Sequence, residues 1–301
     1  MLNSQAAELL TMLAGAPPLA STPIEARRQA ATRAVSLTGD VTELAAVDDV
    51  LVDTVPVRVY RPSVSPGLPV VAFAHGGGWS IGNLDTHDRM ARDLAARSGA
   101  VVVAIDFRLA PEHPFPAGLD DCVGVLRRLL QDGAGLAVDP ARVAVCGESS
   151  GANLLAAACQ SLRGTGIVHQ VLIYPVLDLA GVGATESYRA FGESGYFHST
   201  EDIAHIVRDY AGTADVRDPR LSPARAADLS GLPPATILTA ELDPVRDEAE
   251  AYAGRLGDAG VPVELRRFDG QIHAFVSFAG VLEDGVRGRA WIADRIRQAL
   301  F

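Results

Sequence analysis

The chain has 301 residues, of which 48% are hydrophobic and 21% are charged, and its formal net charge is −11 at pH 7. This composition is typical of a globular protein and excludes a largely disordered one, and the length suits one α/β domain with a large core. The negative charge disfavours binding to nucleic acids and to anionic membranes.

Individual segments indicate where the protein is located and whether it has disulfides or a metal. No apolar run approaches the roughly 20 residues of a membrane span, and the N-terminus lacks the basic start and apolar stretch of a secretory signal, so we expect a cytoplasmic protein. The three cysteines, Cys122, Cys146 and Cys159, do not make a disulfide framework and are predicted to be buried free thiols. No Cys/His cluster has metal-ligand spacing, so we expect neither a metal nor a cofactor.

Strand and helix signals alternate along most of the chain. Residues 50–61 alternate around a short turn and predict an antiparallel pair of strands. Further strands are predicted at 70–74, 101–106, 143–146, 168–174, 236–239 and 261–268. Helices are predicted between and after them at 88–97, 119–130, 154–162, 247–258 and 288–300. This order predicts an α/β fold with a mostly parallel eight-stranded sheet and helices on both faces.

Two segments fall outside the alternation. Residues 4–38 are Ala-rich and helical but are interrupted by prolines. Residues 179–228 have helical periodicity around 200–210 and no buried strand. We therefore expect both segments to lie outside the sheet and its covering helices.

The most informative motif lies near the middle of the chain. The apolar run at 143–146 leads into Gly-Glu-Ser-Ser-Gly at 147–151, and an Ala- and Leu-rich helical segment follows at 152–162. A Gly-x-Ser-x-Gly sequence between a strand and a helix is typical of a nucleophile elbow, in which the serine hydroxyl projects from a sharp turn. Ser149 is therefore predicted to be a catalytic nucleophile.

Three consecutive glycines follow the strand predicted at 70–74. Acyl transfer needs backbone N–H donors aimed at the oxygen that becomes negative, and residues without a Cβ atom let the main chain turn its N–H groups inward. We predict Gly77 and Gly78 as donors of an oxyanion hole, with Gly76 shaping the turn and the N–H of Ser150 as the third donor. The loop lacks the Gly-Lys-Ser/Thr ending of a phosphate loop.

Seven histidines are available as the base. His273 lies in the loop 269–275 after the alternating strand at 261–268, which places it over the carboxyl edge of the sheet, and it is the predicted base. His75 precedes the glycines and is expected to brace their loop. The others lie in polar stretches or lack a strand-end context: His87, His113, His169, His198 and His205.

The carboxylate that orients the histidine is expected between serine and histidine in chain order. The strand at 236–239 ends in an acidic loop, in which Asp243 is the leading candidate because Pro244 keeps it out of helical geometry. Glu241 is the alternative. Asp247 and Glu248 are expected to serve the first turn of the next helix.

Together these motifs resemble those of the hormone-sensitive-lipase-like (bacterial family IV) carboxylesterases of the α/β-hydrolase superfamily. The resemblance runs from about Val57 to the C-terminus and is carried by four blocks, at 75–79, 107–117, 147–151, and 243–248 with 272–275. It implies the α/β-hydrolase fold, with Ser149 as nucleophile, Asp243 as acid and His273 as base.

The chain departs from the family pattern at four positions. Phe107 replaces the usual tyrosine, and Glu148 and Ser150 replace Asp and Ala beside the nucleophile. Ala274 stands where glycine is common after the histidine. None of these changes removes a catalytic atom, so they bear on substrate range and pH optimum.

The resemblance also implies a cap over the site. It would be formed by residues 1–40 and by the insertion 179–228, on a single domain of residues 1–301. Trp79, Tyr196 and Phe197 are candidates for lining an apolar substrate pocket, with ordinary packing beneath the cap as the alternative.

These observations predict a serine carboxylesterase that hydrolyses short- to medium-chain esters through an acyl-enzyme. The preference for short chains comes from the resemblance alone. Two alternatives stay open: an amidase or peptidase on the same scaffold, and a non-catalytic small-molecule receptor. The predicted strand at 261–268 is a candidate edge strand, so a homodimer is possible.

Overall fold

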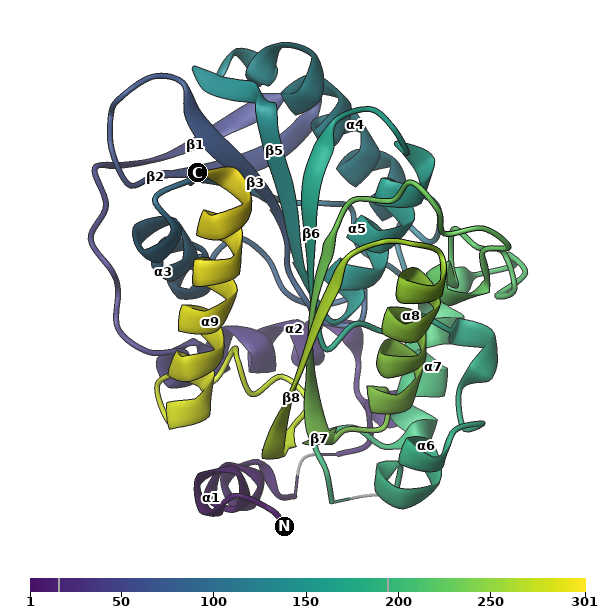
Figure 1. The fold of residues 1–301 in the computed structure, drawn as a ribbon. Coiled ribbons are helices and arrows are strands. Elements are labelled where there is room, and N and C mark those ends of the chain that lie inside the picture. Colours follow the sequence, from purple (N-terminus) through teal and green to yellow (C-terminus); the bar gives the residue numbers. More distant parts are fainter. Residues whose placement is uncertain (16, 194) are drawn as a thin grey trace.

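A single twisted sheet runs through the centre of the molecule (Figure 1). The computed structural model describes residues 1–15, 17–193 and 195–301. The eight strands are β1 (Ala46–Val52), β2 (Val55–Arg61), β3 (Leu68–Ala74), β4 (Val101–Ile105), β5 (Val138–Glu148), β6 (Ile167–Ile173), β7 (Ala235–Leu242) and β8 (Val263–Ile272).

The strand order is β1-β2-β4-β3-β5-β6-β7-β8. β2 pairs antiparallel with β1 and with β4, and every other neighbouring pair is parallel. The predicted mostly parallel eight-stranded sheet is therefore confirmed, and β8 is an edge strand as expected.

Helices cover both faces of this sheet (Figure 1). One face carries α3 (Asp88–Ser98) and α9 (Glu283–Leu300), which pack against each other. The other face carries α4 (Ala117–Asp132), α5 (Ser150–Ser161) and α8 (Arg246–Asp258). Short 3₁₀ turns connect the elements: η1 (Leu19–Ser21), η2 (Ala34–Leu37), η3 (Gly133–Gly135), η4 (Leu179–Gly181) and η5 (Pro223–Arg225).

The central strands are apolar on both sides because both faces of the sheet are covered. In β3, Val70 and Ala72 belong to the hydrophobic cluster under α4 and α5, whereas Val71 and Phe73 belong to the cluster under α3 and α9. Cys122, Cys146 and Cys159 are buried free thiols in these two clusters, as predicted.

Several strands extend beyond their predicted bounds, among them β5 at its start and β8 at its end. β5 begins at Val138, which pairs with Leu68 ahead of a register shift, and the polar residues 139–142 between Val138 and the apolar run were not recognised as strand. β8 continues to Ile272, which pairs with Leu242 after a register shift, so residues 269–272 belong to the strand and not to a loop. His273 consequently follows the strand directly.

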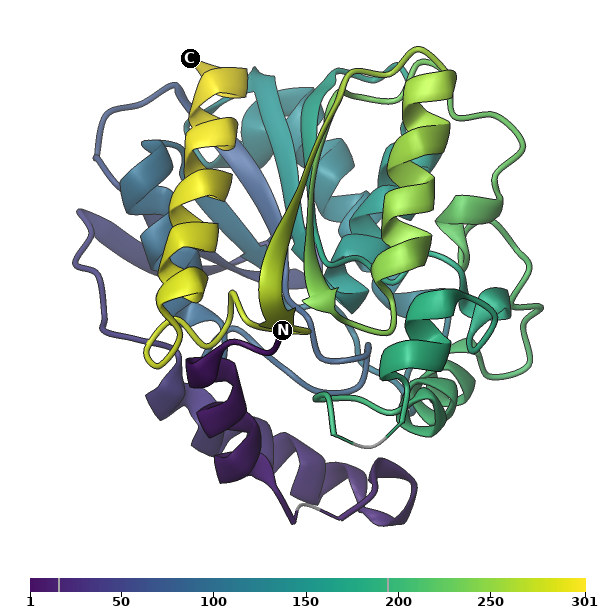
Figure 2. The same ribbon diagram turned by 60° about the horizontal axis from the view of Figure 1, so that its bottom comes forward.

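The two segments outside the alternation meet at the end of the molecule where the parallel strands terminate (Figures 1 and 2). The N-terminal segment forms α1 (Ser4–Leu13) and α2 (Ile24–Arg33), and the insertion forms α6 (Glu186–Phe191) and α7 (Thr200–Ala211). The N–H of Leu19 donates to Asp202 Oδ1 at 3.1 Å, and Arg27 pairs with Asp209 at 3.4 Å. These contacts join the N-terminal segment to α7 of the insertion.

A helix both apolar enough and long enough to cross a membrane is absent from residues 1–15, 17–193 and 195–301.

Candidate active site

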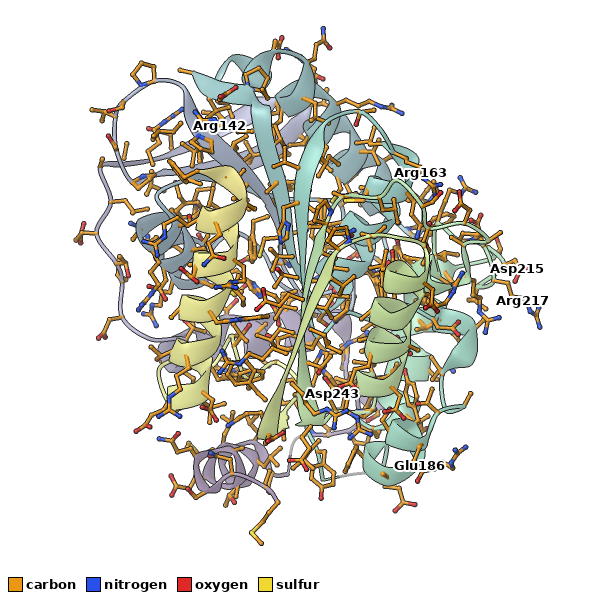
Figure 3. The ribbon with its side chains drawn as sticks, in the orientation of Figure 1. Arg142, Arg163, Glu186, Asp215, Arg217 and Asp243 are labelled. Carbon is orange, nitrogen blue, oxygen red and sulfur yellow. The ribbon has the colours of Figure 1, made fainter. Side chains whose placement is uncertain are left out.

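The predicted catalytic and oxyanion-hole residues follow four parallel strands that end at the same edge of the sheet. Ser149 follows β5, Asp243 follows β7, His273 follows β8, and the three glycines follow β3. Figure 3 labels Asp243 at the lower end of β7, beside the end of β8. Because parallel strands present their carboxyl ends at one edge, residues far apart in the sequence converge there.

Ser149 occupies a sharp turn between β5 and α5. Its backbone has φ 52° and ψ −116°, a conformation that few residues other than glycine adopt. The turn also brings α5 against β3: a Cβ atom on Gly151 would lie 2.2 Å from the carbonyl oxygen of Ala74. The strand–turn–helix geometry predicted from the motif is thus present, and it requires a residue without a side chain at 151.

A chain of hydrogen bonds links the three predicted triad residues. Ser149 Oγ lies 2.8 Å from His273 Nε2, and His273 Nδ1 lies 2.7 Å from Asp243 Oδ2. The other carboxylate oxygen of Asp243 accepts the N–H of Val245 at 3.0 Å. Ser149, His273 and Asp243 are only 8%, 6% and 1% exposed, so water competes little for these bonds.

The pKa of His273 is raised above its ordinary value. Burial opposes protonation of the ring, but the charge and the hydrogen bond of Asp243, helped by the charge of Glu148, outweigh that effect. The imidazole is therefore a better proton acceptor than a histidine in water.

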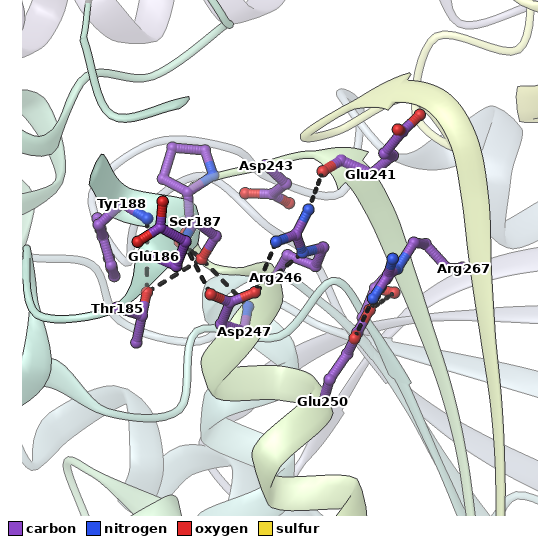
Figure 4. A network of polar contacts seen from close by, with 12 residues as sticks. Thr185, Glu186, Ser187, Tyr188, Glu241, Asp243, Arg246, Asp247, Glu250 and Arg267 are labelled. Carbon is purple, nitrogen blue, oxygen red and sulfur yellow. Dashed lines mark hydrogen bonds and ion pairs between the residues drawn. The ribbon is translucent and has the colours of Figure 1, made fainter. Parts of the chain in front are cut away.

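Figure 4 shows how the loop that carries Asp243 is held. The hydroxyl of Ser187, in α6, donates to the carbonyl of Pro244 at 2.7 Å, and the N–H of Ser187 donates to Asp247 Oδ2 at 2.8 Å. The carboxylate of Glu241 instead accepts the N–H of Gly270 at 2.6 Å, so Asp243 and not Glu241 meets His273.

Asp247 and Glu248 lie in the first turn of α8 as expected, but their side chains bond elsewhere. Asp247 holds Ser187 of the insertion, and Glu248 accepts the N–H of Leu177 at 2.6 Å. The two carboxylates therefore lie at the N-terminus of α8, as expected, and also accept hydrogen bonds from backbone N–H groups of neighbouring segments.

The glycine loop packs tightly against its surroundings. Gly77 has φ 120° and Gly78 has φ 58°. A Cβ atom at Gly77 would lie 2.2 Å from the carbonyl oxygen of Ile81, and one at Gly78 would lie 2.4 Å from Ile206 of α7. Side chains are therefore excluded at both positions, and the main chain passes close to Ser149, which lines the same cavities as Gly78.

His75 braces this loop as predicted. Its Nδ1 lies 2.7 Å from the carbonyl oxygen of Gly76, and its ring stacks on Phe107 at a centroid distance of 4.4 Å. Burial lowers the pKa of His75 to about 3, so the ring is neutral. Phe107, which departs from the family tyrosine, thus supports the loop by stacking.

Two cavities meet at Ser149 and His273. The smaller has a volume of about 30 Å³, and its lining includes Trp79, Val176 and Ile203. The larger, of about 320 Å³, extends between the glycine loop and the alanine-rich face of α2. The site is therefore asymmetric, with one short and one long apolar lobe.

The three predicted pocket residues have different positions. Trp79 lines the smaller cavity and stacks on Tyr210 at 4.4 Å, and Phe197 lines the larger one. Tyr196 lines neither and instead packs edge-on against Phe191 at 5.5 Å, so its prediction as a pocket residue needs correction. The segment is irregular, with Phe197 at φ 46°, so the sequence did not indicate which of the two neighbours faced the site.

Two histidines that the sequence set aside lie at the site. His198 lines both cavities, with its ring 5.7 Å from that of His273, and burial lowers its pKa to about 4. His87 Nε2 lies 2.9 Å from the carboxylate of Glu148. Neither histidine follows a predicted strand, which is why the sequence set them aside. Glu148, a departure from the family pattern, was the one feature of the sequence that could have indicated a partner such as His87.

Ala274 has φ 65°, the left-handed conformation that favours glycine. The resembled family commonly has glycine at this position, and the geometry of the turn after His273 explains that preference. Ser150 Oγ, the other departure beside the nucleophile, is buried and finds no hydrogen-bond partner within the described residues.

Comparisons with known proteins agree with this geometry. A family model described as the alpha/beta hydrolase fold matches residues 71–277. Carboxylesterase NlhH of Mycobacterium tuberculosis (strain ATCC 25618 / H37Rv) is 44% identical over 238 residues, which cover 76% of this chain and 73% of that protein. An ethyl acetate hydrolase of Pseudomonas putida is 34% identical over 289 residues, covering 92% and 90% of the two chains.

Among solved structures, a hyperthermophilic esterase from the archaeon Pyrobaculum calidifontis superposes with a TM-score of 0.93 at 34% identity and covers 99% of this chain and 98% of its own. Sequence relatives and structural neighbours thus agree with the motifs. The chain belongs to the α/β-hydrolase superfamily, as a member of its hormone-sensitive-lipase-like carboxylesterases.

Proposed function

We propose that this protein is a serine carboxylesterase that hydrolyses short- to medium-chain esters through an acyl-enzyme. The observation that carries the proposal is the continuous hydrogen-bond chain from Ser149 through His273 to Asp243 at the carboxyl edge of the sheet. The relatives named carboxylesterase and ethyl acetate hydrolase support the same reaction.

In the proposed mechanism, His273 Nε2 takes the proton of Ser149 as Oγ attacks the ester carbonyl carbon. The carbonyl oxygen becomes an oxyanion, which accepts hydrogen bonds from the N–H groups of Gly77, Gly78 and Ser150. Ser150 begins α5, so its N–H is among those a helix leaves without an internal partner.

The tetrahedral intermediate then collapses. The C–O bond to the alcohol breaks, and His273 returns its proton to the departing alkoxide. Asp243 stabilises the protonated imidazole and fixes its orientation. Water, deprotonated by His273, attacks the acyl-enzyme carbonyl in the same way and releases the carboxylic acid and free Ser149.

The two lobes suggest the shape of the ester. An ester carbonyl carries two substituents, and the small lobe near Trp79 has room for a short one only. We assign the acyl group to the small lobe and the alcohol to the larger cavity, which the acetyl ester in the name of the Pseudomonas putida relative supports. Trp79 and Phe197 would then contact the acyl and the alcohol parts, respectively.

The N-terminal residues 1–40 and the insertion 179–228 are proposed to form a cap. Their mutual contacts, and the presence of α2 and Phe197 in the wall of the larger cavity, support this role. A homodimer through β8 and a cytoplasmic location stay predictions.

The function is tested by hydrolysis of p-nitrophenyl esters from acetate to palmitate, beside the matched amide p-nitroacetanilide. We expect the highest kcat/KM at acetate to butyrate and far slower amide cleavage. Faster amide cleavage would favour an amidase. Saturable binding of a small ligand without turnover of either substrate would favour a receptor.

A further inference from the structure

We propose that Glu148 is a positioning residue, which holds the oxyanion loop through the N–H of Gly76 and is itself held by His87. The inference rests on the proposed esterase function, because it concerns the loop that would bind the oxyanion. It assigns a task to a side chain that takes no part in the proton transfers described above.

The carboxylate of Glu148 is buried beneath the glycine loop. The residue immediately precedes Ser149 and is 3% exposed. Its Oε2 accepts the N–H of Gly76 at 3.2 Å, and its Oε1 accepts the hydroxyl of Tyr174 at 3.0 Å. A buried carboxylate that accepts several hydrogen bonds is held in one orientation. Turning away from any donor would leave a buried charge without that hydrogen bond, which costs free energy.

His87 completes this set of donors. Its Nε2 lies 2.9 Å from Glu148 Oε2, and Thr86 Oγ1 lies 2.9 Å from its Nδ1. The Thr86 hydroxyl donates its own proton to the carbonyl oxygen of Asn83 at 2.9 Å. An ionised carboxylate can only accept, so the bond between His87 and Glu148 needs a proton on Nε2. His87 immediately precedes α3, so the pair connects this helix to the loop.

Gly76 and Glu148 are in direct contact. A Cβ atom on Gly76 would lie 2.7 Å from Oε2, 2.9 Å from Cδ and 3.0 Å from Oε1 of Glu148, all nearest atoms belonging to that one side chain. The first peptide of the loop therefore rests on the carboxylate. Since Gly77 and Gly78 follow directly, the position of Glu148 determines where their N–H groups point.

Glu148 also acts on the proposed base through its charge. It is one of the groups that raise the pKa of His273. Burial opposes ionisation of Glu148, but the hydrogen bond and charge of His87, with His273 and Tyr174, lower its pKa to about 2. The titratable and charged groups around Glu148 are His75, His87, Cys146, Tyr174, His273 and Arg289.

The first test replaces Glu148 by Gln, which keeps an acceptor oxygen but removes the charge. We expect kcat on p-nitrophenyl acetate to fall about 10- to 100-fold, less than the roughly 10²–10³-fold for loss of a whole oxyanion donor, with a smaller change in KM. The acid limb of the kcat/KM profile should move to lower pH, since the base loses a nearby negative charge. A purely structural role would not move that limb.

The matched control is Glu264→Gln, which removes a carboxylate from β8 that pairs with Arg295 at the surface. It should leave kcat and the pH profile at their wild-type values. If Glu148→Gln does not fold, His87→Gln is the second variant, because the His87 side chain lies nearer the surface than that of Glu148. It should lower kcat in the same direction.

A double-mutant cycle tests the contact itself. Gly76→Ala should lower kcat strongly in the wild type, because the new Cβ displaces the carboxylate and the loop. In Glu148→Ala the clashing atoms are gone, so the same substitution should have a much smaller effect. Equal effects of Gly76→Ala in both backgrounds would overturn the proposal.

The outcomes separate the two proposals. A wild-type protein that does not hydrolyse p-nitrophenyl acetate would count against the esterase function. An active wild type whose kcat and acid limb are unchanged by Glu148→Gln would leave the esterase standing and overturn the positioning role.

Discussion

The Nε2 atom of His273 lies 2.8 Å from the Oγ atom of Ser149, although 124 residues separate them in the chain. The sheet brings them together, because β5 and β8 run parallel and end at the same edge. Asp243, at the end of β7 between them, lies on the far side of the imidazole ring. The strands thus present Ser149, Asp243 and His273 in that order along the edge, and the His273 ring lies between the other two side chains.

Asp243→Asn should lower kcat by about 10⁴-fold, as loss of the orienting carboxylate does in other serine hydrolases. The variant should also show in which direction the charge of Asp243 shifts the pKa of His273. Asp243 raises the pKa of His273, so activity in the wild type falls as the pH drops through that raised value, above 6.5. In the variant the midpoint should move to lower pH, which a pH profile of kcat/KM measures. Glu241→Gln is the control and should keep the wild-type profile.

Gly78→Ala should lower kcat by about 10²–10³-fold, the loss typical of one missing oxyanion donor. The added Cβ would lie 2.4 Å from Ile206 Cγ2, so the loop or α7 must move. Gly124→Ala is the matched control, because its Cβ, in α4, would meet nothing within 4 Å. It should keep full activity and gain up to about 1 kcal/mol in helix stability, seen as a higher Tm. Wild-type kcat in Gly78→Ala would argue against the assigned donor.

Ala26→Phe should fill the larger cavity from α2, where alanines leave it open. The kcat/KM for acetate esters of long alcohols should fall relative to that for methyl acetate. The order of kcat/KM along a series of p-nitrophenyl esters with different acyl chains should stay as in the wild type. Gln29→Phe places the same side chain on the exposed side of α2 and serves as the control. Loss confined to long acyl chains would reverse the assignment of the two lobes.

The free energy of unfolding should depend on pH through Glu248. Burial raises its pKa to about 8, above the roughly 4.3 of an unfolded glutamate. Its contribution to stability is therefore full below about pH 4 and is lost as the pH rises through about 8. Glu248→Gln keeps an acceptor for the N–H of Leu177 but cannot ionise, so its stability should fall less between about pH 5 and 9 in urea unfolding. An equal fall in both proteins would contradict this account.

The sequence predicted the parts of the site that strand ends and chain order define. Ser149 and Asp243 each follow a recognisable apolar strand and His273 follows an alternating one, and the parallel topology makes their convergence expected. It could not predict contacts that depend on side-chain direction in irregular segments. Phe197 faces the cavity while Tyr196 packs on Phe191, and His87 reaches Glu148 from a polar stretch. The end of β8 was missed because the polar residues 269–271 hide a strand that pairing with β7 extends.

The central claim is that Ser149 carries the acyl group during turnover. Protein quenched with acid during p-nitrophenyl acetate hydrolysis, then digested, should carry one acetyl group on the peptide containing Ser149. Ser149→Ala should keep its fold, lose the acetyl group and lose about 10⁶-fold in kcat. Wild-type turnover by Ser149→Ala, or an acetyl group on another peptide that persists in the variant, would contradict the account.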